Sequence, residues 1–117
     1  MRTPSEPVQY AIALCRECHN VCLDTFFNHC LDMGGAHVAH DHALAMNDCI
    51  QACQTAADFM ARGSVQHRVE CEACARICDI CARSCEVFDC EEMKACAQIC
   101  RRCAESCRRM THLSVAA

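Results

Sequence analysis

Cysteines recur along this 117-residue chain at alternating steps of three and four residues. The longest series comprises Cys71, Cys74, Cys78, Cys81 and Cys85, and a later one comprises Cys96, Cys100, Cys103 and Cys107. Because an α-helix has 3.6 residues per turn, this spacing places all members of a series on one helix face. It is the spacing of the a and d positions through which helices pack in bundles. The pattern therefore predicts helices that pack through faces of cysteine, and no segment shows the alternation of a strand.

The same periodicity extends through the rest of the chain. An earlier segment repeats it with His42, Met46, Cys49, Cys53, Ala56 and Met60. The first segment follows it more loosely, with Ala11, Cys15, Cys18, Cys22, Phe26 and His29, while Cys30 lies one residue off the line. His67 begins the third series, and Met93 and Met110 bound the fourth. Cys90 falls in a turn. Charged residues such as Arg76 and Asp79 lie between these positions and predict a solvated outer face.

Helix-breaking residues divide the chain into long segments. The glycines are Gly34, Gly35 and Gly63, and both prolines lie within the first seven residues. We expect helices over about 4–33, 38–62, 64–88 and 90–110. Short connections make successive helices antiparallel neighbours. The predicted fold is all-α, an antiparallel up-down-up-down four-helix bundle with a cysteine-lined core, in a single domain over 1–117.

Three sequence signals predict where helices begin. Thr3-Pro4-Ser5-Glu6 has the form of a capping box with proline at the first helical position. Ser64 is the expected cap of the third helix. Asp89, with Glu92 three residues later, is the expected cap of the fourth.

Sulfur must fill much of the interior, because the chain has 16 cysteines but few large aliphatic residues. The apolar stretch Ala11–Leu14 is too short for a secretory signal, and no segment approaches the ~18 apolar residues of a membrane span. We therefore expect a cytoplasmic protein that keeps its thiols reduced and has no membrane partner. A net charge of −4, one tyrosine and no tryptophan argue against nucleic acid as a partner.

A face of cysteines is suited to binding soft metal ions. Cysteines three or four apart have Cβ atoms about 5–6 Å apart, close enough for two sulfurs to hold one metal. Thiolate and thioether ligands favour Cu(I). Several zinc–tetrathiolate centres would bury net negative charge, whereas bridged Cu(I) thiolates are near neutral. We predict storage of multiple Cu(I) ions, on the order of sixteen if each sulfur accounts for one metal.

Other functions remain as alternatives. A dedicated zinc protein is one, although structural zinc sites usually pair separated Cys-x2-Cys knuckles on loops. A thiol-based redox or detoxifying enzyme is another, although such enzymes place one Cys-x-x-Cys beside a strand. Iron–sulfur binding lacks the ferredoxin spacing. If the cysteines only filled the core, they would have no advantage over alanine or leucine, which argues against a purely structural role. We therefore expect a protein that is not an enzyme.

Histidines and methionines gather at one predicted end of the bundle. The segment from Gly35 to His42 contains His37, His40 and His42, and it adjoins His29, Cys30, Cys85, Cys90 and Met93, with Met46 one turn inside. We interpret this His-rich end as a copper entrance. At the other end, His67 is a candidate accessory ligand, and Met60 and Met110 are more typical of packing.

These residues together give the chain a resemblance to the bacterial cytosolic copper storage proteins, a cysteine-rich four-helix-bundle family. The resemblance rests on the Cys-x2-Cys-x3-Cys repeats and the His/Met-containing turn, and it covers about residues 5–112. It implies copper homeostasis or detoxification by Cu(I) held on inward thiolates, metal entrance at one end, and a homotetramer. The second helix departs from the pattern with only two cysteines. The candidate metal ligands are Cys15, Cys18, Cys22, Cys30, Cys49, Cys53, Cys71, Cys74, Cys78, Cys81, Cys85, Cys90, Cys96, Cys100, Cys103, Cys107, His29, His42, Met46 and His67.

Overall fold

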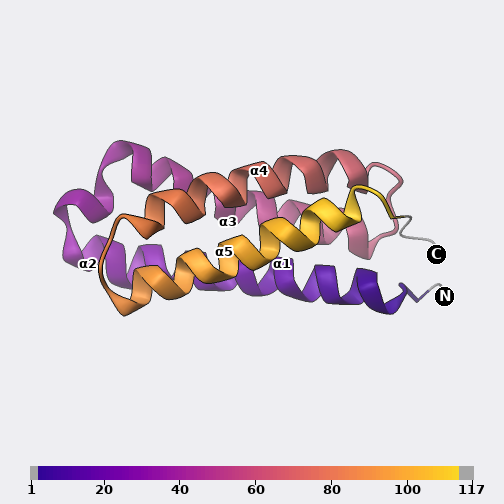
Figure 1. Cartoon of the computed structure of the whole chain (residues 1–117), viewed down its shortest axis with the longest axis horizontal. Coiled ribbons are helices and arrows are strands. Elements are labelled where there is room, and N and C mark those ends of the chain that lie inside the picture. Colours follow the sequence, from indigo (N-terminus) through magenta and orange to yellow (C-terminus); the bar gives the residue numbers. More distant parts are fainter. Residues whose placement is uncertain (1–2, 114–117) are drawn as a thin grey trace.

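Four long helices dominate the computed structural model of the chain, which describes residues 3–113. They are α1 (Glu6–Thr25), α3 (His40–Ala61), α4 (His67–Glu86) and α5 (Glu91–Met110), and the described residues contain no strand. Successive long helices run in opposite directions, so α1 begins at the end of the bundle where α5 finishes (Figure 1). Each packs on its neighbours in the order α1, α3, α4, α5 and back to α1. The predicted all-α four-helix bundle is confirmed.

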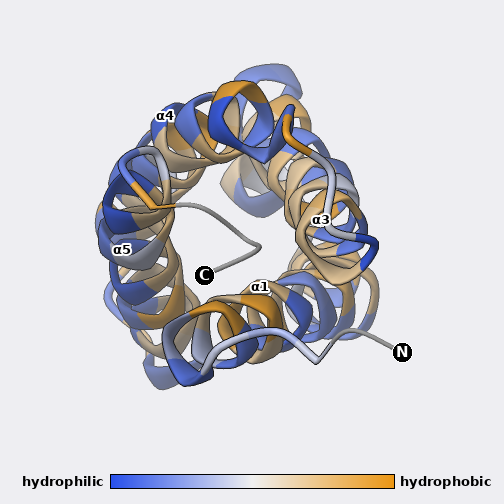
Figure 2. Cartoon of the chain, turned by 90° about the vertical axis from the view of Figure 1, so that its right-hand side faces the viewer, coloured by the Kyte–Doolittle hydropathy of each residue, from blue (hydrophilic) through white to orange (hydrophobic). Residues whose placement is uncertain are grey.

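The helices enclose an interior made mainly of cysteine, alanine and methionine. Viewed along the bundle, the hydrophobic parts of the helices face inward and the hydrophilic parts face outward (Figure 2). Met46, Met60, Met93 and Met110 are all buried, whereas large aliphatic side chains such as Val8 and Leu14 are few in the core. The cysteine series therefore occupies the positions that leucine holds in an ordinary bundle, and the predicted cysteine-lined core is confirmed.

The first helix contains an irregular turn near its end. It continues from α1 through a π-helical turn, η1 (Phe26–Cys30), into the short α2 (Leu31–Met33). A π turn accommodates one additional residue, which shifts the following side chains around the helix axis. Cys30 is consequently fully buried, and His29 is only half-buried. The sequence spacing placed His29 on the inward line and Cys30 beside it, and the π turn reverses that assignment.

Glycines end the first and second long segments. Gly34 has φ 67° and ψ −162°, a backbone conformation essentially restricted to glycine. It leads into a short 3₁₀ helix, η2 (Gly35–Val38), that precedes α3. Gly63 has φ 72° and follows α3. The helix boundaries differ from the expected ones by two or three residues at several ends, most clearly where α4 begins at His67.

The helix caps predicted from sequence are wrong. Ser5 is the N-cap of α1, but its side chain makes no capping hydrogen bond. Because α4 begins three residues later than expected, the Ser64 hydroxyl accepts a hydrogen bond from the Gln66 backbone N–H in the preceding turn, at 3.1 Å. The carboxylate of Asp89 pairs with Lys94 Nζ at 3.1 Å, and Cys90 occupies the N-cap of α5.

Ion pairs between neighbouring helices lie on the outer surface of the bundle. Arg101 on α5 contacts Glu86 at 2.8 Å and Asp79 at 3.3 Å, both on α4. Such exposed pairs contribute only about 0–1 kcal/mol each. In the described part of the chain, none of the helices has the length and apolar character needed to span a bilayer.

Candidate metal centre

Free thiols fill the middle of the bundle at short mutual distances. Every cysteine except Cys90 is buried, and none forms a disulfide in the structure. The contacting sulfurs are 3.5–4.0 Å apart, from Cys22–Cys96 at the short end to Cys18–Cys49 at the long end. Two sulfurs bound to one metal at about 2.3 Å each are separated by at most about 4.6 Å. The thiols are therefore already spaced as ligands of shared metal ions.

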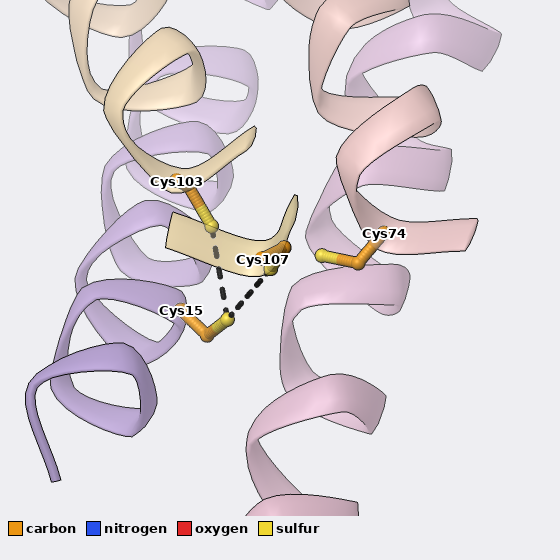
Figure 3. A group of neighbouring side chains, drawn as sticks. All are labelled: Cys15, Cys74, Cys103 and Cys107. Carbon is orange, nitrogen blue, oxygen red and sulfur yellow. Dashed lines mark hydrogen bonds between the residues drawn. The ribbon is translucent and has the colours of Figure 1, made fainter. Parts of the chain in front are cut away.

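One group of four cysteines lies toward the end of the bundle where α1 begins. It joins Cys15 of α1, Cys74 of α4, and Cys103 and Cys107 of α5, with all four sulfurs within 4.8 Å of one another. Figure 3 shows these side chains pointing toward one another from three helices. The Cys15 sulfur is 3.6 Å from that of Cys107 and 3.7 Å from that of Cys103.

Three further four-cysteine groups follow along the bundle and share members with their neighbours. Together the groups are Cys15/Cys74/Cys103/Cys107, Cys18/Cys53/Cys78/Cys103, Cys18/Cys22/Cys49/Cys100 and Cys22/Cys81/Cys96/Cys100. Cys103 links the first to the second, and Cys18 links the second to the third. Cys22 and Cys100 link the third to the fourth. The four groups form one continuous column of sulfur, which we call the thiol column.

The two cysteines of α3 lie at the centre of the thiol column. The Cys49 sulfur lies 3.7 Å from that of Cys78, 3.9 Å from those of Cys22 and Cys100, and 4.0 Å from that of Cys18. Cys53 lies one turn further on, 3.6 Å from Cys78. The shortage of cysteine in α3 therefore leaves the middle of the column intact and changes only its ends, where Met46 and Met60 take the inward positions.

Burial and neighbouring sulfur set the protonation of the metal-free thiols. Burial, followed by the nearby Cys96 and Cys90, raises the pKa of Cys30 to about 11. A hydrogen bond with Cys107, followed by burial, raises the pKa of Cys71 well above its usual range. Hydrogen bonds from surrounding thiols instead lower the pKa of Cys103, as they do those of Cys49 and Cys96. Most thiols must therefore lose a proton to become metal ligands.

Mixed ligands replace the pure sulfur set at the inner part of the His-rich end. The Cys30 sulfur is 3.7 Å from His42 Nε2 and 3.7 Å from the Met93 sulfur. The Met46 sulfur is 3.9 Å from that of Cys85. Burial lowers the pKa of His42, which keeps its ring neutral and able to bind metal.

Ser84 orients the His42 ring. Its hydroxyl is 2.7 Å from His42 Nδ1, on the side of the ring away from Cys30. When Nδ1–H donates to this hydroxyl, Nε2 presents its lone pair toward the Cys30 sulfur. Metal-binding histidines are commonly oriented in this way by a hydrogen bond to the ring nitrogen that does not bind the metal. Ser84 is not among the residues predicted from sequence, because nothing in the cysteine spacing marks a serine on the flank of α4.

The outermost part of the His-rich end brings together residues from three segments. His29, His37 and Cys90 have ligand atoms within 4.8 Å of one another. His37 belongs to the His-rich segment noted in the sequence but was not among the candidate ligands. Burial, followed by the nearby His29, lowers the pKa of His37.

His67 occupies the opposite end of the bundle and contacts backbone oxygens. Its Nε2 lies 2.6 Å from the Leu113 carbonyl oxygen and 3.1 Å from that of Met110, and its Nδ1 lies 3.1 Å from that of Ser64. These contacts tie the start of α4 to the end of α5. His67 lies outside the four-sulfur groups, and its role as an accessory ligand stays a prediction.

Comparison with known proteins agrees with this geometry. A family model described as Csp, copper storage protein, matches residues 4–112. The chain is similar to the structure of the Nmul_A1745 protein from Nitrosospira multiformis, with 45% identity and a TM-score of 0.87 over 91% of this chain and 95% of that one. It is also similar to the Cu(I)-bound copper storage protein BsCsp3, with 28% identity and a TM-score of 0.82 over 96% of this chain and 100% of that one.

The apo form of copper storage protein 3 from Bacillus subtilis matches as well, with 30% identity and a TM-score of 0.79 over 88% of this chain and 97% of that one. No curated protein sequence is significantly similar to the chain. The family match spans nearly all of the helical bundle, including every cysteine of the thiol column. The chain belongs to the copper storage protein family.

Proposed function

We propose that this protein stores multiple Cu(I) ions on the thiolates of its interior. The observation that carries the proposal is the thiol column, in which four buried four-cysteine groups share members along the bundle. A shared sulfur bridges neighbouring metal ions, so the column accommodates a chain of ions. A Cu(I)-bound relative with the same fold supports copper as the metal.

The charge of the interior favours Cu(I) over Zn²⁺. Among the described residues, the buried polar side chains are Thr25, His42, His67 and Ser106, and no lysine or arginine is buried. A zinc ion with four thiolates carries a net charge of −2, which nothing in this interior would offset. Cu(I) bridged by thiolates at about one metal per sulfur is nearly neutral. The interior is therefore suited to the monovalent ion.

The proposed ligands follow a gradient from the thiol column to the His-rich end. The column supplies bridging thiolates, and Cys71 and Cys85 extend it. Cys30, His42 and Met46 form an intermediate stage, and His29 and Cys90 the outermost one. Neutral imidazole and thioether ligands hold Cu(I) more loosely than bridging thiolates, which allows copper to be passed inward.

The proposal extends to the setting in which storage takes place. Free thiols at this density require a reducing compartment, which supports a cytoplasmic location. The proposal includes the homotetramer that the family resemblance implies, and exposed apolar side chains such as Tyr10, Phe27 and Leu44 are available for contacts between subunits. We assign no catalytic role, and copper storage would protect other proteins from Cu(I) or supply it to them.

A metal competition experiment tests this proposal. The reduced protein is titrated under anaerobic conditions with Cu(I) and, in parallel, with Zn²⁺, using chromogenic chelators at one pH. We expect Cu(I) to displace bound Zn²⁺ from the interior. Tighter binding of Zn²⁺ than of Cu(I) would instead assign the column to zinc.

A further inference from the structure

The cluster of His29, His37 and Cys90 differs in composition from the thiol column. It contains a single sulfur and two imidazoles, and it shares no residue with the four-sulfur groups. His29 comes from η1, His37 from η2, and Cys90 from the connection between α4 and α5. All three side chains are half-buried rather than enclosed. The cluster is therefore a separate set of ligand atoms near the surface.

The distance between two ligand atoms of this cluster matches that of a tetrahedral zinc site, and the third ligand atom lies within 4.8 Å of both. The Cys90 sulfur lies 3.7 Å from His29 Nε2. With Zn–S near 2.3 Å and Zn–N near 2.05 Å, a tetrahedral angle separates sulfur from nitrogen by about 3.6 Å. Three protein ligands and one open position are the arrangement of accessible zinc sites. The metal-free side chains therefore need little movement to bind a tetrahedral ion.

Charge at this position permits a divalent ion, in contrast to the interior. One thiolate and two neutral imidazoles around a divalent cation give a net charge of +1. Partial exposure allows water to stabilise that charge, which a buried site would not. Imidazole is also a common ligand of zinc.

The His37 ring supplies an independent observation in favour of metal binding. Its Nε2 is buried and has no hydrogen-bond partner among the described residues. The ring is held between His29, at 5.3 Å between centroids, and Phe88, at 4.2 Å. A buried polar atom without a hydrogen-bond partner is unfavourable, because it has lost its contacts with water and gained none in return. A metal ion bound by this ring would account for its placement.

We propose that His29, His37 and Cys90 form a site for one Zn²⁺ ion, with its fourth position open to solvent. His29 and Cys90 also belong to the outermost copper stage proposed above. They become available to zinc once copper has moved to the deeper thiolates. Since its ligands come from three segments of the chain, the bound ion would link the end of the first helix, η2 and the α4–α5 turn. The site adds a second class of metal to the copper storage proposed above. The zinc proposal rests on copper storage at one point only, because the following test uses bound Cu(I) to block the interior thiols.

Co²⁺ is a suitable probe for this site, because it adopts tetrahedral zinc sites and its spectrum reports sulfur ligation. The reduced protein is first loaded anaerobically with Cu(I) in the presence of a Cu(I)-selective chelator that retains loosely held copper. After removal of the chelator, Co²⁺ is titrated in. We expect one Co²⁺ per chain, a sulfur-to-cobalt charge-transfer band, intense tetrahedral d–d bands, and loss of these bands when Zn²⁺ is added.

Three variants test the ligand assignment. C90S should remove the charge-transfer band. Outer partners of metal ligands typically contribute about 10- to 100-fold to affinity, so loss of a direct ligand in H37A should weaken Co²⁺ binding by at least about tenfold. The matched control is H40A, which removes an exposed histidine of the same segment that lies outside the cluster, and it should bind Co²⁺ as the unmodified protein does.

The two proposals fail in distinguishable ways. If the interior takes up no Cu(I), the loading step fails before cobalt is added, and the storage function is refuted. Far-ultraviolet circular dichroism spectra of C90S and H37A that match that of the unmodified protein show that both variants fold. The zinc site is overturned if the copper-loaded protein gives no charge-transfer band, if the band survives C90S, or if H37A binds Co²⁺ as tightly as H40A.

Discussion

Acidification should release Cu(I) from the thiol column while affecting binding by His42 and Met46 much less. Hydrogen bonds from neighbouring thiols, followed by burial, raise the pKa of Cys18, Cys22 and Cys74, and ordinary thiols already titrate near 8.5, so these column thiols are protonated at neutral pH. Each must lose its proton to bind copper. By contrast, burial lowers the pKa of His42, and Met46 carries no proton to lose. Affinity in the column therefore rises with pH, and affinity at the His/Met ligands is nearly constant above the pKa of His42.

The size of this effect follows from the number of protons displaced. Below the thiol pKa, each displaced proton changes the apparent affinity about tenfold per pH unit, which gives about a hundredfold loss between pH 8 and pH 6. Neighbouring thiols lower the pKa of Cys49, Cys96 and Cys103, so these three of the sixteen cysteines can already be ionised. We therefore expect about 0.8 to 1 proton released per coordinated thiolate.

Two measurements check this prediction. Proton release is followed with a pH indicator as Cu(I) is added anaerobically to reduced protein in weak buffer. Apparent affinity is measured by chelator competition at pH 6, 7 and 8. Release of less than about half a proton per copper, or an affinity that changes less than about threefold over this range, would refute thiolate ligation in the column.

Three substitutions give further predictions. Cys103 belongs to two four-sulfur groups and Cys71 to none. C103S should therefore lower the copper content measured after gel filtration by about two ions, and C71S by at most about one. Equal losses in the two variants would contradict the sharing of sulfurs along the column. S84A should release the His42 ring and slow Cu(I) uptake in stopped-flow measurements without changing capacity, and unchanged kinetics would remove the positioning role of Ser84. G34A should destabilise the reduced metal-free protein by about 1–3 kcal/mol in thermal unfolding, because only glycine readily adopts φ 67° with ψ −162°, and unaltered stability would show that the turn relaxes.

The helical periodicity predicted most of the fold because the inward series is long and regular. In α4 and α5 every cysteine after the first turn follows steps of three and four, and each of these side chains is buried. The helix starts were less predictable. Serine and aspartate favour several positions near a helix start, so their presence alone does not identify the N-cap residue, and at α5 that residue is Cys90 rather than Asp89.

Two features of the site depend on three-dimensional packing that spacing does not contain. In the sequence, the π turn at Phe26–Cys30 is visible only as Cys30 lying one residue off the regular spacing. In the structure, it buries Cys30 in the core and leaves His29 near Cys90. Spacing likewise shows which cysteines share a helix face but not which ones meet across the bundle. The grouping of Cys15 with Cys74, for example, depends on the stagger between α1 and α4.

Copper stoichiometry tests the central claim most directly. Fully reduced protein is titrated anaerobically with Cu(I) against a chromogenic chelator until the chelator begins to retain copper. If the thiol column is a store of bridged Cu(I), the chain should take up on the order of sixteen ions, near one per cysteine. Saturation at about four ions or fewer would mean that each four-sulfur group holds a single metal and would contradict the account.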